Sequence, residues 1–493
     1  MIIHVNTLPG AGPLQKGWDA RAREIVGVLL GMIGDGALDP RMLPALRVHL
    51  DWIQYRANFR DPVISRRATD ARGAALPLAE VAIDLRRAEG PALREALARA
   101  LAGMNPPPPG AAAPEHDESA HLDAWAPLRD SIIWRFNRLF WQRVSDWEAA
   151  SGRTFEAALP SGRSDANHPE AVADADADFW TLLRDLDKRG QLPADIFALE
   201  IGVGSGARAA AWLDRFRALD DERGTGYYGR LRFLLGDYSM PTLERAMAAV
   251  HRHHDGVSVI GMDALDPLRT LSFLRYKILY IHLTNVYDNL SYDELVRRDG
   301  RLHLVEARAY LSDADAARIS AGAGIAAADL PQAVERLLDV GPDLFGDRAR
   351  GVQFWRDVWG ALRLEERLVA LDDVAQVPLP PGLDQSHLEE LLAAAPDDVR
   401  FHLSRDAARS FVNTVPLLHP RGYLQVQDIF VTAMSEYRHG FRGPGKLDGA
   451  VVTWVNGALL QAVGARTGYD VHFAPFPYRP GSRTSILYTT PRD

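Results

Sequence analysis

The stretch that decides the fold is residues 198–206, which reads ALEIGVGSG. It completes a short apolar run that begins at Ile196, and it places Gly202, Gly204 and Gly206 directly before a helical pattern. Alternating glycines between a strand and a helix let the backbone approach a ligand closely, and the first helical turn offers unpaired N–H groups. The stretch therefore predicts a nucleotide-like ligand, although its spacing also satisfies the dinucleotide fingerprint G-x-G-x-x-A.

Strands and helices alternate beyond this stretch. The patterns predict strands at 231–235, 257–261 and 277–283, and helices at 207–219 and 240–250. Such alternation favours a parallel sheet that helices cover on both faces. Three more strands are expected at 423–426, 471–475 and 486–490. A segment rich in proline and glycine separates the last two, which predicts a hairpin.

Acidic residues stand at three successive strand ends. Glu200 lies two residues before the first glycine, where a carboxylate would repel a pyrophosphate and stabilise the cationic sulfonium and amino groups of S-adenosylmethionine. Asp237 is placed to accept hydrogen bonds from two ribose hydroxyls, and Asp263 from the exocyclic amine of adenine. Together the three carboxylates predict a nucleoside site at one edge of the sheet.

These segments resemble motifs I, II and III of the class I S-adenosylmethionine-dependent methyltransferases. The resemblance rests on residues 199–206, on GDYSMP at 236–241, and on Asp263 and Ala264. It implies an α/β fold with a Rossmann-like seven-stranded sheet, methyl transfer, and S-adenosyl-L-methionine as the cofactor. The expected cofactor-binding residues are Glu200, Gly202, Gly204, Gly206, Asp237, Tyr238, Asp263, Ala264 and Asn285.

A weaker likeness is to the MidA-like branch, whose relatives include protein arginine methyltransferases of mitochondrial complex assembly. It rests on NVYDNL at 285–290 and on residues 423–431. The chain has Val286 where that branch has an acidic residue, which disfavours protein arginine as the methyl acceptor.

Candidate catalytic residues lie in and after the fourth expected strand. Methyl transfer is an in-line displacement on an activated sulfonium, so a base is needed only where the nucleophile must lose a proton. Asp288 and His282 are the candidates for that base, and Tyr287 lies at the edge where the substrate is expected. The alternatives are a capping role for Asp288 and a position within the strand for His282. Asp428, which ends the fifth expected strand, points to the same edge by topology.

The rest of the chain is expected to form helical additions around the catalytic domain. The expected division is an N-terminal helical domain at 1–104, a linker rich in proline and alanine at 105–119, an aromatic helical lid or connector at 120–190, and the methyltransferase domain at 191–493 with a helical insertion at 312–412. Within the first domain, helices are expected at 22–33, 43–59, 78–87 and 93–101. An aromatic helix at 130–149 is expected either to pack in the core or to wall a ligand pocket.

Composition limits the remaining options. The 493 residues carry a net charge of -9, and the chain lacks the Asn-Pro-Pro-aromatic motif, so no nucleic-acid partner is expected. With no cysteine, disulfides and thiolate chemistry are excluded. No metal site is expected, because the histidines at 251, 253 and 254 have no carboxylate at a ligand spacing. Apolar runs are far shorter than the roughly 20 residues that span a bilayer, so we expect a cytoplasmic protein with no membrane partner.

The favoured function is direct methyl transfer to an oxygen or nitrogen nucleophile of a small metabolite or a protein side chain, with assembly as a homodimer left open. Two alternatives stay open at this point. One is an NAD-dependent oxidoreductase, which fits Gly202, Gly204 and Ala207. The other is a non-catalytic cofactor-binding protein with an assembly or regulatory role. Glu200 and the expected terminal hairpin weigh against the oxidoreductase.

Overall fold

The computed structural model describes most of the chain. The described residues are 2–6, 18–40, 46–51, 57–59, 63–69, 75–84, 93–95, 97–98, 101, 119–159, 162–298, 300–439 and 443–492. The expected linker at 105–119 lies outside them, except for its last residue. Within the described ranges, every helix is too short or too polar to cross a membrane.

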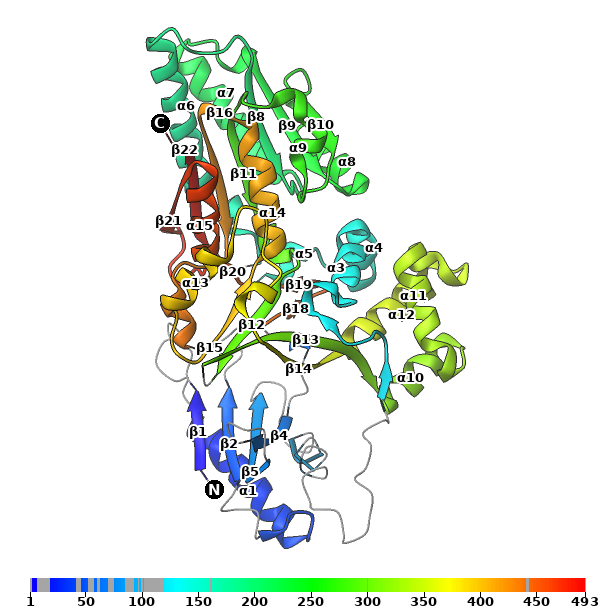
Figure 1. Cartoon of the computed structure of the whole chain (residues 1–493). Coiled ribbons are helices and arrows are strands. Elements are labelled where there is room, and N and C mark those ends of the chain that lie inside the picture. Colours follow the sequence, from blue (N-terminus) through cyan, green and yellow to red (C-terminus); the bar gives the residue numbers. More distant parts are fainter. Residues whose placement is uncertain are drawn as a thin grey trace.

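The main sheet has seven strands, shown in the upper part of Figure 1. Their order is β10 (Val257–Gly261), β9 (Leu231–Asp237), β8 (Ile196–Ile201), β11 (Ile278–Thr284), β16 (Leu418–Asp428), β22 (Ser485–Pro491) and β21 (Tyr469–Pro475). The first five strands run parallel, whereas β22 is antiparallel to both of its neighbours. The fold is therefore the Rossmann-like seven-stranded sheet with the terminal hairpin that the sequence predicts.

Helices cover both faces of this sheet. One face carries α6 (Pro169–Lys188), α7 (Ala207–Arg223) and α8 (Met240–Ala249), and the other carries α9 (Pro267–Thr270), α14 (Arg405–Thr414) and α15 (Gly457–Thr467). Side chains of β8 alternate between the two cores: Ile196 and Ala198 pack with the first set, and Leu199 and Ile201 with the second. Because both faces are buried, the strand is apolar at nearly every position, as parallel strands usually are.

A second, antiparallel sheet lies below the main one in Figure 1. Two of its strands fall within residues 312–412, so the insertion expected there is not purely helical. Its order is β14 (Arg363–Leu371), β13 (Arg301–Ser312), β12 (Asp293–Arg298) and β15 (Val399–Leu403), and β6 (Ser119–His121) and β7 (Ala126–Pro127) also pair with β13. Helices α10 (Asp313–Ala323), α11 (Leu330–Val340), α12 (Arg348–Ala361) and α13 (Gln385–Ala393) lie between these strands along the chain. Every second residue of β13 from Val305 to Leu311 is buried, a two-residue period that favours a strand.

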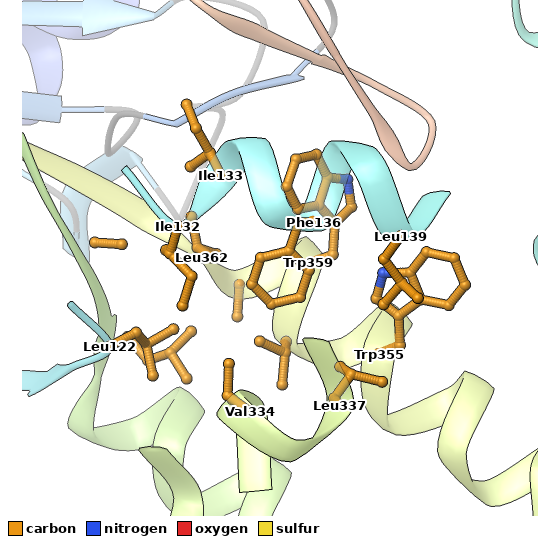
Figure 2. Packing of buried hydrophobic residues seen from close by; sticks show 14 of the residues in the cluster. Leu122, Ile132, Ile133, Phe136, Leu139, Val334, Leu337, Trp355, Trp359 and Leu362 are labelled. Atoms are coloured by element: carbon orange, nitrogen blue, oxygen red, sulfur yellow. The ribbon is translucent and has the colours of Figure 1, made fainter. Parts of the chain in front are cut away.

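The expected aromatic helix is divided into α3 (Ile133–Gln142) and α4 (Val144–Ser151), which meet at Arg143. Figure 2 shows one face of α3 packed against α11 and α12, with Phe136 beside Trp359. This cluster joins α3 to β13 and to the segment between β13 and β14, so the helix holds a defined position relative to the second sheet.

In the N-terminal region, two of the four helix predictions are wrong. Residues 43–59 and 78–87 were expected to be helical, but they contain β2 (Leu46–Asp51), β3 (Ala57–Asn58) and most of β5 (Ala75–Asp84). A four-stranded sheet has the order β1 (Ile2–Asn6), β2, β5 and β4 (Val63–Thr69). Leu46, Val48 and Leu50 alternate with polar residues, which is the two-residue period of a strand. Pairing of this segment with β1 and β5 favours the strand over a helix. The helix expected at 22–33 is confirmed within α1 (Trp18–Gly34).

Candidate cofactor and acceptor site

The glycine loop between β8 and α7 has a backbone that only glycine suits. Gly202, Gly204 and Gly206 have φ values of 74°, 52° and 76°. A Cβ atom at Gly202 would lie 2.5 Å from Cγ2 of Val286, and one at Gly206 would lie 2.6 Å from Cα of Ala246. The loop is therefore pressed against the segment after β11 and against α8, and α7 begins without a side-chain cap.

The strand-end carboxylates lie beside this loop. Oδ1 of Asp237 accepts a hydrogen bond from the Ser239 N–H at 2.9 Å, and Oδ1 of Asp263 accepts one from the Leu265 N–H at 2.9 Å. Asp237 is also held by backbone hydrogen bonds from Tyr238 and from Val203 of the glycine loop. Backbone N–H groups thus orient both carboxylates at the loop. Burial raises the pKa of Asp237 to about 6, against the opposing effect of its backbone hydrogen bonds.

A cavity of about 750 Å³ unites these elements. Eight of the nine predicted cofactor residues line it: Glu200, Gly202, Gly204, Asp237, Tyr238, Asp263, Ala264 and Asn285. Gly206 is absent from the wall because it packs against α8. Asn285 adopts φ of 50°, and its N–H donates to the Gln427 carbonyl at 3.0 Å, which fixes the turn after β11 at the cavity.

The aromatic helix α3 forms another wall of the cavity. Trp134 and Trp141 line the cavity, whereas Phe136 and Phe140 lie in the core on the other face of the helix. The indole N–H of Trp141 donates to Oδ1 of Asn289 at 3.0 Å. The two roles considered for this helix therefore occur together, on different faces.

Glu200 occupies a different electrostatic setting from the one predicted. Its Oε2 accepts a hydrogen bond from Nη1 of Arg208 at 2.8 Å, and the two side chains are only 5% and 4% exposed. The second terminal nitrogen of Arg208 donates to the Tyr280 hydroxyl at 2.6 Å. Because the guanidinium neutralises the carboxylate, the charge of Glu200 does not by itself separate a sulfonium from a pyrophosphate. The sequence analysis did not consider Arg208. A basic residue in the first turn of the helix after the glycines could have indicated a counter-charge for Glu200.

The structure does not support the catalytic role that the sequence suggested for His282. The residue lies within β11, is fully buried and does not line the cavity. Its Nδ1 lies 3.0 Å from Oε1 of Gln425, and its Nε2 lies 2.7 Å from Oγ1 of Thr284. Burial holds the pKa of His282 well below its ordinary value. With both ring nitrogens engaged inside the sheet, His282 is a structural residue, as its alternative interpretation proposed.

Asp288 and Tyr287 are also buried away from the cavity wall. Oδ1 of Asp288 accepts from Nδ2 of Asn289 at 2.7 Å, and burial together with the nearby Asp428 raises the pKa of Asp288 well above its ordinary value. Oδ2 of Asp428 accepts from the N–H groups of Tyr287 and Asp288 at 2.9 and 3.2 Å. These contacts hold the turn after β11 in place. Neither Asp288 nor Tyr287 is therefore positioned to act as a base on a substrate in the cavity.

Polar residues that the sequence did not single out line the cavity instead. Glu156 of α5 (Phe155–Ala158), Ser291 and Asp406 belong to its wall. The Ser291 hydroxyl donates to Oδ2 of Asp406 at 2.6 Å. These residues come from segments far apart along the chain, so no local motif signals them.

The seven-stranded order, the glycine loop and the strand-end carboxylates together define a class I methyltransferase fold. No protein-family model matches the chain, and no curated protein matches its sequence. Among solved structures, it is similar to a COG1565 superfamily member from Burkholderia thailandensis bound to S-adenosyl-homocysteine, at 13% identity over 74% of this chain and 88% of that chain, with a TM-score of 0.43. It is also similar to the CcbJ methyltransferase from Streptomyces caelestis, at 12% identity over 68% and 93% of the two chains, with a TM-score of 0.31. Because both TM-scores are low, the function is inferred below from this chain's own residues.

Proposed function

We propose that the protein is an S-adenosylmethionine-dependent methyltransferase. The observation that carries this proposal is the convergence of the glycine loop, Asp237 and Asp263 on one cavity. The cofactor fits this donor set: Asp237 would accept from the ribose hydroxyls, Asp263 and Ala264 would hold the adenine, and the glycine loop would allow close backbone contact. The bound cofactor supplies an activated methyl group, and the protein's task is to orient it toward an acceptor.

The acceptor is proposed to be a small molecule that presents an oxygen or nitrogen nucleophile. A cavity of about 750 Å³ has the size of small-molecule sites, and α3 closes one side of it. The cavity wall offers Trp134 as an apolar surface and Ser291 and Asp406 as polar contacts for this acceptor. A protein side chain is the second candidate, and it would have to enter the same space.

An NAD-dependent oxidoreductase is less well supported. Since Arg208 neutralises Glu200, the discriminating feature is now the antiparallel hairpin of β21 and β22, which the doubly wound dinucleotide fold does not require. Calorimetry with S-adenosylhomocysteine and with NAD tests the choice. Binding of the first alone is expected, and binding of NAD alone would overturn the proposal. Methyl transfer to candidate acceptors then separates an enzyme from a binding protein.

Cofactor binding is expected to weaken as the pH falls below about 6. The pKa of Asp237 is raised to about 6, so its carboxylate is ionised above this pH and loses one acceptor oxygen on protonation below it. The dissociation constant for S-adenosylhomocysteine should therefore rise up to tenfold per pH unit below 6.

The matched variant for this prediction is Asp237→Asn. At pH 7.5 it should bind S-adenosylhomocysteine roughly 10- to 100-fold more weakly, because it loses a charged acceptor. Its affinity should also respond less to pH between 5 and 8 than that of the wild type. Identical pH profiles in the two proteins would rule out Asp237 as the titrating ribose ligand.

A further inference from the structure

Glu156 places a carboxylate directly against the glycine loop. Its Oε1 accepts a hydrogen bond from the Ser205 hydroxyl at 3.2 Å, and the Asn167 amide lies 3.2 and 3.3 Å from its two oxygens. All three residues belong to the cavity wall. Two neutral donors therefore orient the carboxylate at the loop, and neither cancels its charge.

The two other glutamates of the cavity wall are already paired with arginines. Glu200 pairs with Arg208 at 2.8 Å, and Glu148 pairs with Arg245 at 3.0 Å. Within the described residues, no ion pair joins Glu156 to a basic side chain. A cationic group entering the cavity at the glycine loop would therefore find its complementary charge at Glu156.

The strand order determines which end of the cofactor reaches this position. Asp237 ends β9 and Asp263 follows β10, and both strands lie on one side of β8 in the sheet, whereas Asn285 follows β11 on the other side. If the two aspartates hold the nucleoside, the other end of the cofactor would lie toward the glycine loop, because this loop follows the next strand of the sheet. That end carries an α-ammonium group, which a carboxylate binds through charge-assisted hydrogen bonds.

We propose that Glu156 binds the α-ammonium group at the amino-acid end of the cofactor. This inference rests on the proposed function, and it assigns to α5 the recognition that the sequence assigned to Glu200. A segment outside the seven-stranded sheet thereby completes the cofactor site.

The test compares Glu156→Gln with the wild type against three ligands in calorimetry. S-adenosylmethionine and S-adenosylhomocysteine both carry the ammonium group, and both should bind about tenfold or more weakly to the variant. The ligand 5′-deoxy-5′-methylthioadenosine lacks the amino-acid end, so its affinity should be unchanged. Glu244→Gln is the control, because it removes the same charge from an exposed position on α8 outside the cavity wall.

Each other result has a distinct meaning. Weaker binding of S-adenosylmethionine alone would assign Glu156 to the sulfonium and overturn the proposal. Equal weakening for all three ligands would show that Glu156 only supports the loop, and no change for any ligand would also overturn the proposal. Failure of the wild type to bind any of the three ligands would instead refute the proposed function.

Discussion

Arg208→Met is expected to lower the free energy of unfolding by about 3–5 kcal/mol, because it leaves the buried carboxylate of Glu200 without its counter-charge. Both partners are almost fully buried, so solvent compensates poorly for the lost guanidinium. The Tyr280 hydroxyl also loses a donor at 2.6 Å, although it retains Gln425 and His282 as neighbours at 3.0 and 3.1 Å. Urea unfolding of the two proteins at pH 7.5 measures the difference.

The double variant Arg208→Met/Glu200→Gln separates charge from packing. It removes both charges, so it should recover most of the lost stability, as replacements of buried ion pairs by neutral residues often do. Glu200→Gln alone should leave the affinity for S-adenosylhomocysteine near the wild-type value if the carboxylate serves only Arg208. An Arg208→Met protein as stable as the wild type would mean that Glu200 is already neutral in the folded state.

Asp176→Asn is expected to stabilise the protein at high pH. Asp176 lies on α6 with a fully buried side chain, and neither carboxylate oxygen has a hydrogen-bond partner among the described residues. The nearest cation is Arg215, whose Nε lies 3.8 Å from Oδ2. Burial therefore raises the pKa of Asp176 to about 7, against the weaker opposing effects of Arg215 and Arg208.

The sign of this effect follows from proton linkage. The pKa is higher in the folded than in the unfolded state, so the folded protein binds the extra proton and loses stability as the pH rises from about 4 to about 7. At about 1.4 kcal/mol per pKa unit, the loss reaches at most roughly 4 kcal/mol. Asparagine cannot ionise, so the variant should match the wild type near pH 4 and exceed it at pH 8.

Urea unfolding of wild type and Asp176→Asn at pH 4, 6 and 8 checks this expectation. The comparison cancels the titration of all other groups, because only one side chain differs. A stability difference that is constant across the three pH values would show that Asp176 stays ionised in the folded protein.

The main sheet was predictable because its signals are local. Each strand around the glycine loop is an apolar run followed by a turn. Gly202, Asp237 and Asp263 stand at the ends of three strands that are consecutive along the chain and adjacent in the sheet. Carboxyl ends of parallel strands meet at one edge, so the local sequence was sufficient to bring these residues together. The antiparallel hairpin at the carboxyl end followed from its turn-rich connection in the same way.

The second sheet was missed because its pairing is non-local. β12 pairs with β15, so Leu295 lies opposite Phe401, about a hundred residues further along the chain. The intervening helices dominate the apolar pattern of this region, and a strand in isolation has no partner to reveal it. The same reason explains the helices wrongly expected at 43–59 and 78–87. The division of the chain into domains at the expected boundaries stays a prediction.

The catalytic candidates show that position along the chain alone does not identify a catalytic side chain. Asp288 and His282 stand next to the correct sheet edge, yet the folded chain turns both side chains into its interior. A strand end specifies where the backbone emerges, and packing specifies which side chains remain exposed there. For this reason a residue's place after a strand predicted its position in the cavity wall better than a role in acid–base chemistry.

By itself, the sequence determined the main sheet, the need for glycine between β8 and α7, and the carboxylates at the strand ends, because each depends on residues within one turn of a strand end. Only the tertiary structure decided that Arg208 neutralises Glu200 and that Glu156 takes a position beside Ser205. It also decided that α3 closes the cavity. These outcomes depend on burial and on charges brought together across long separations, and electrostatic energies are set by the surroundings that folding creates.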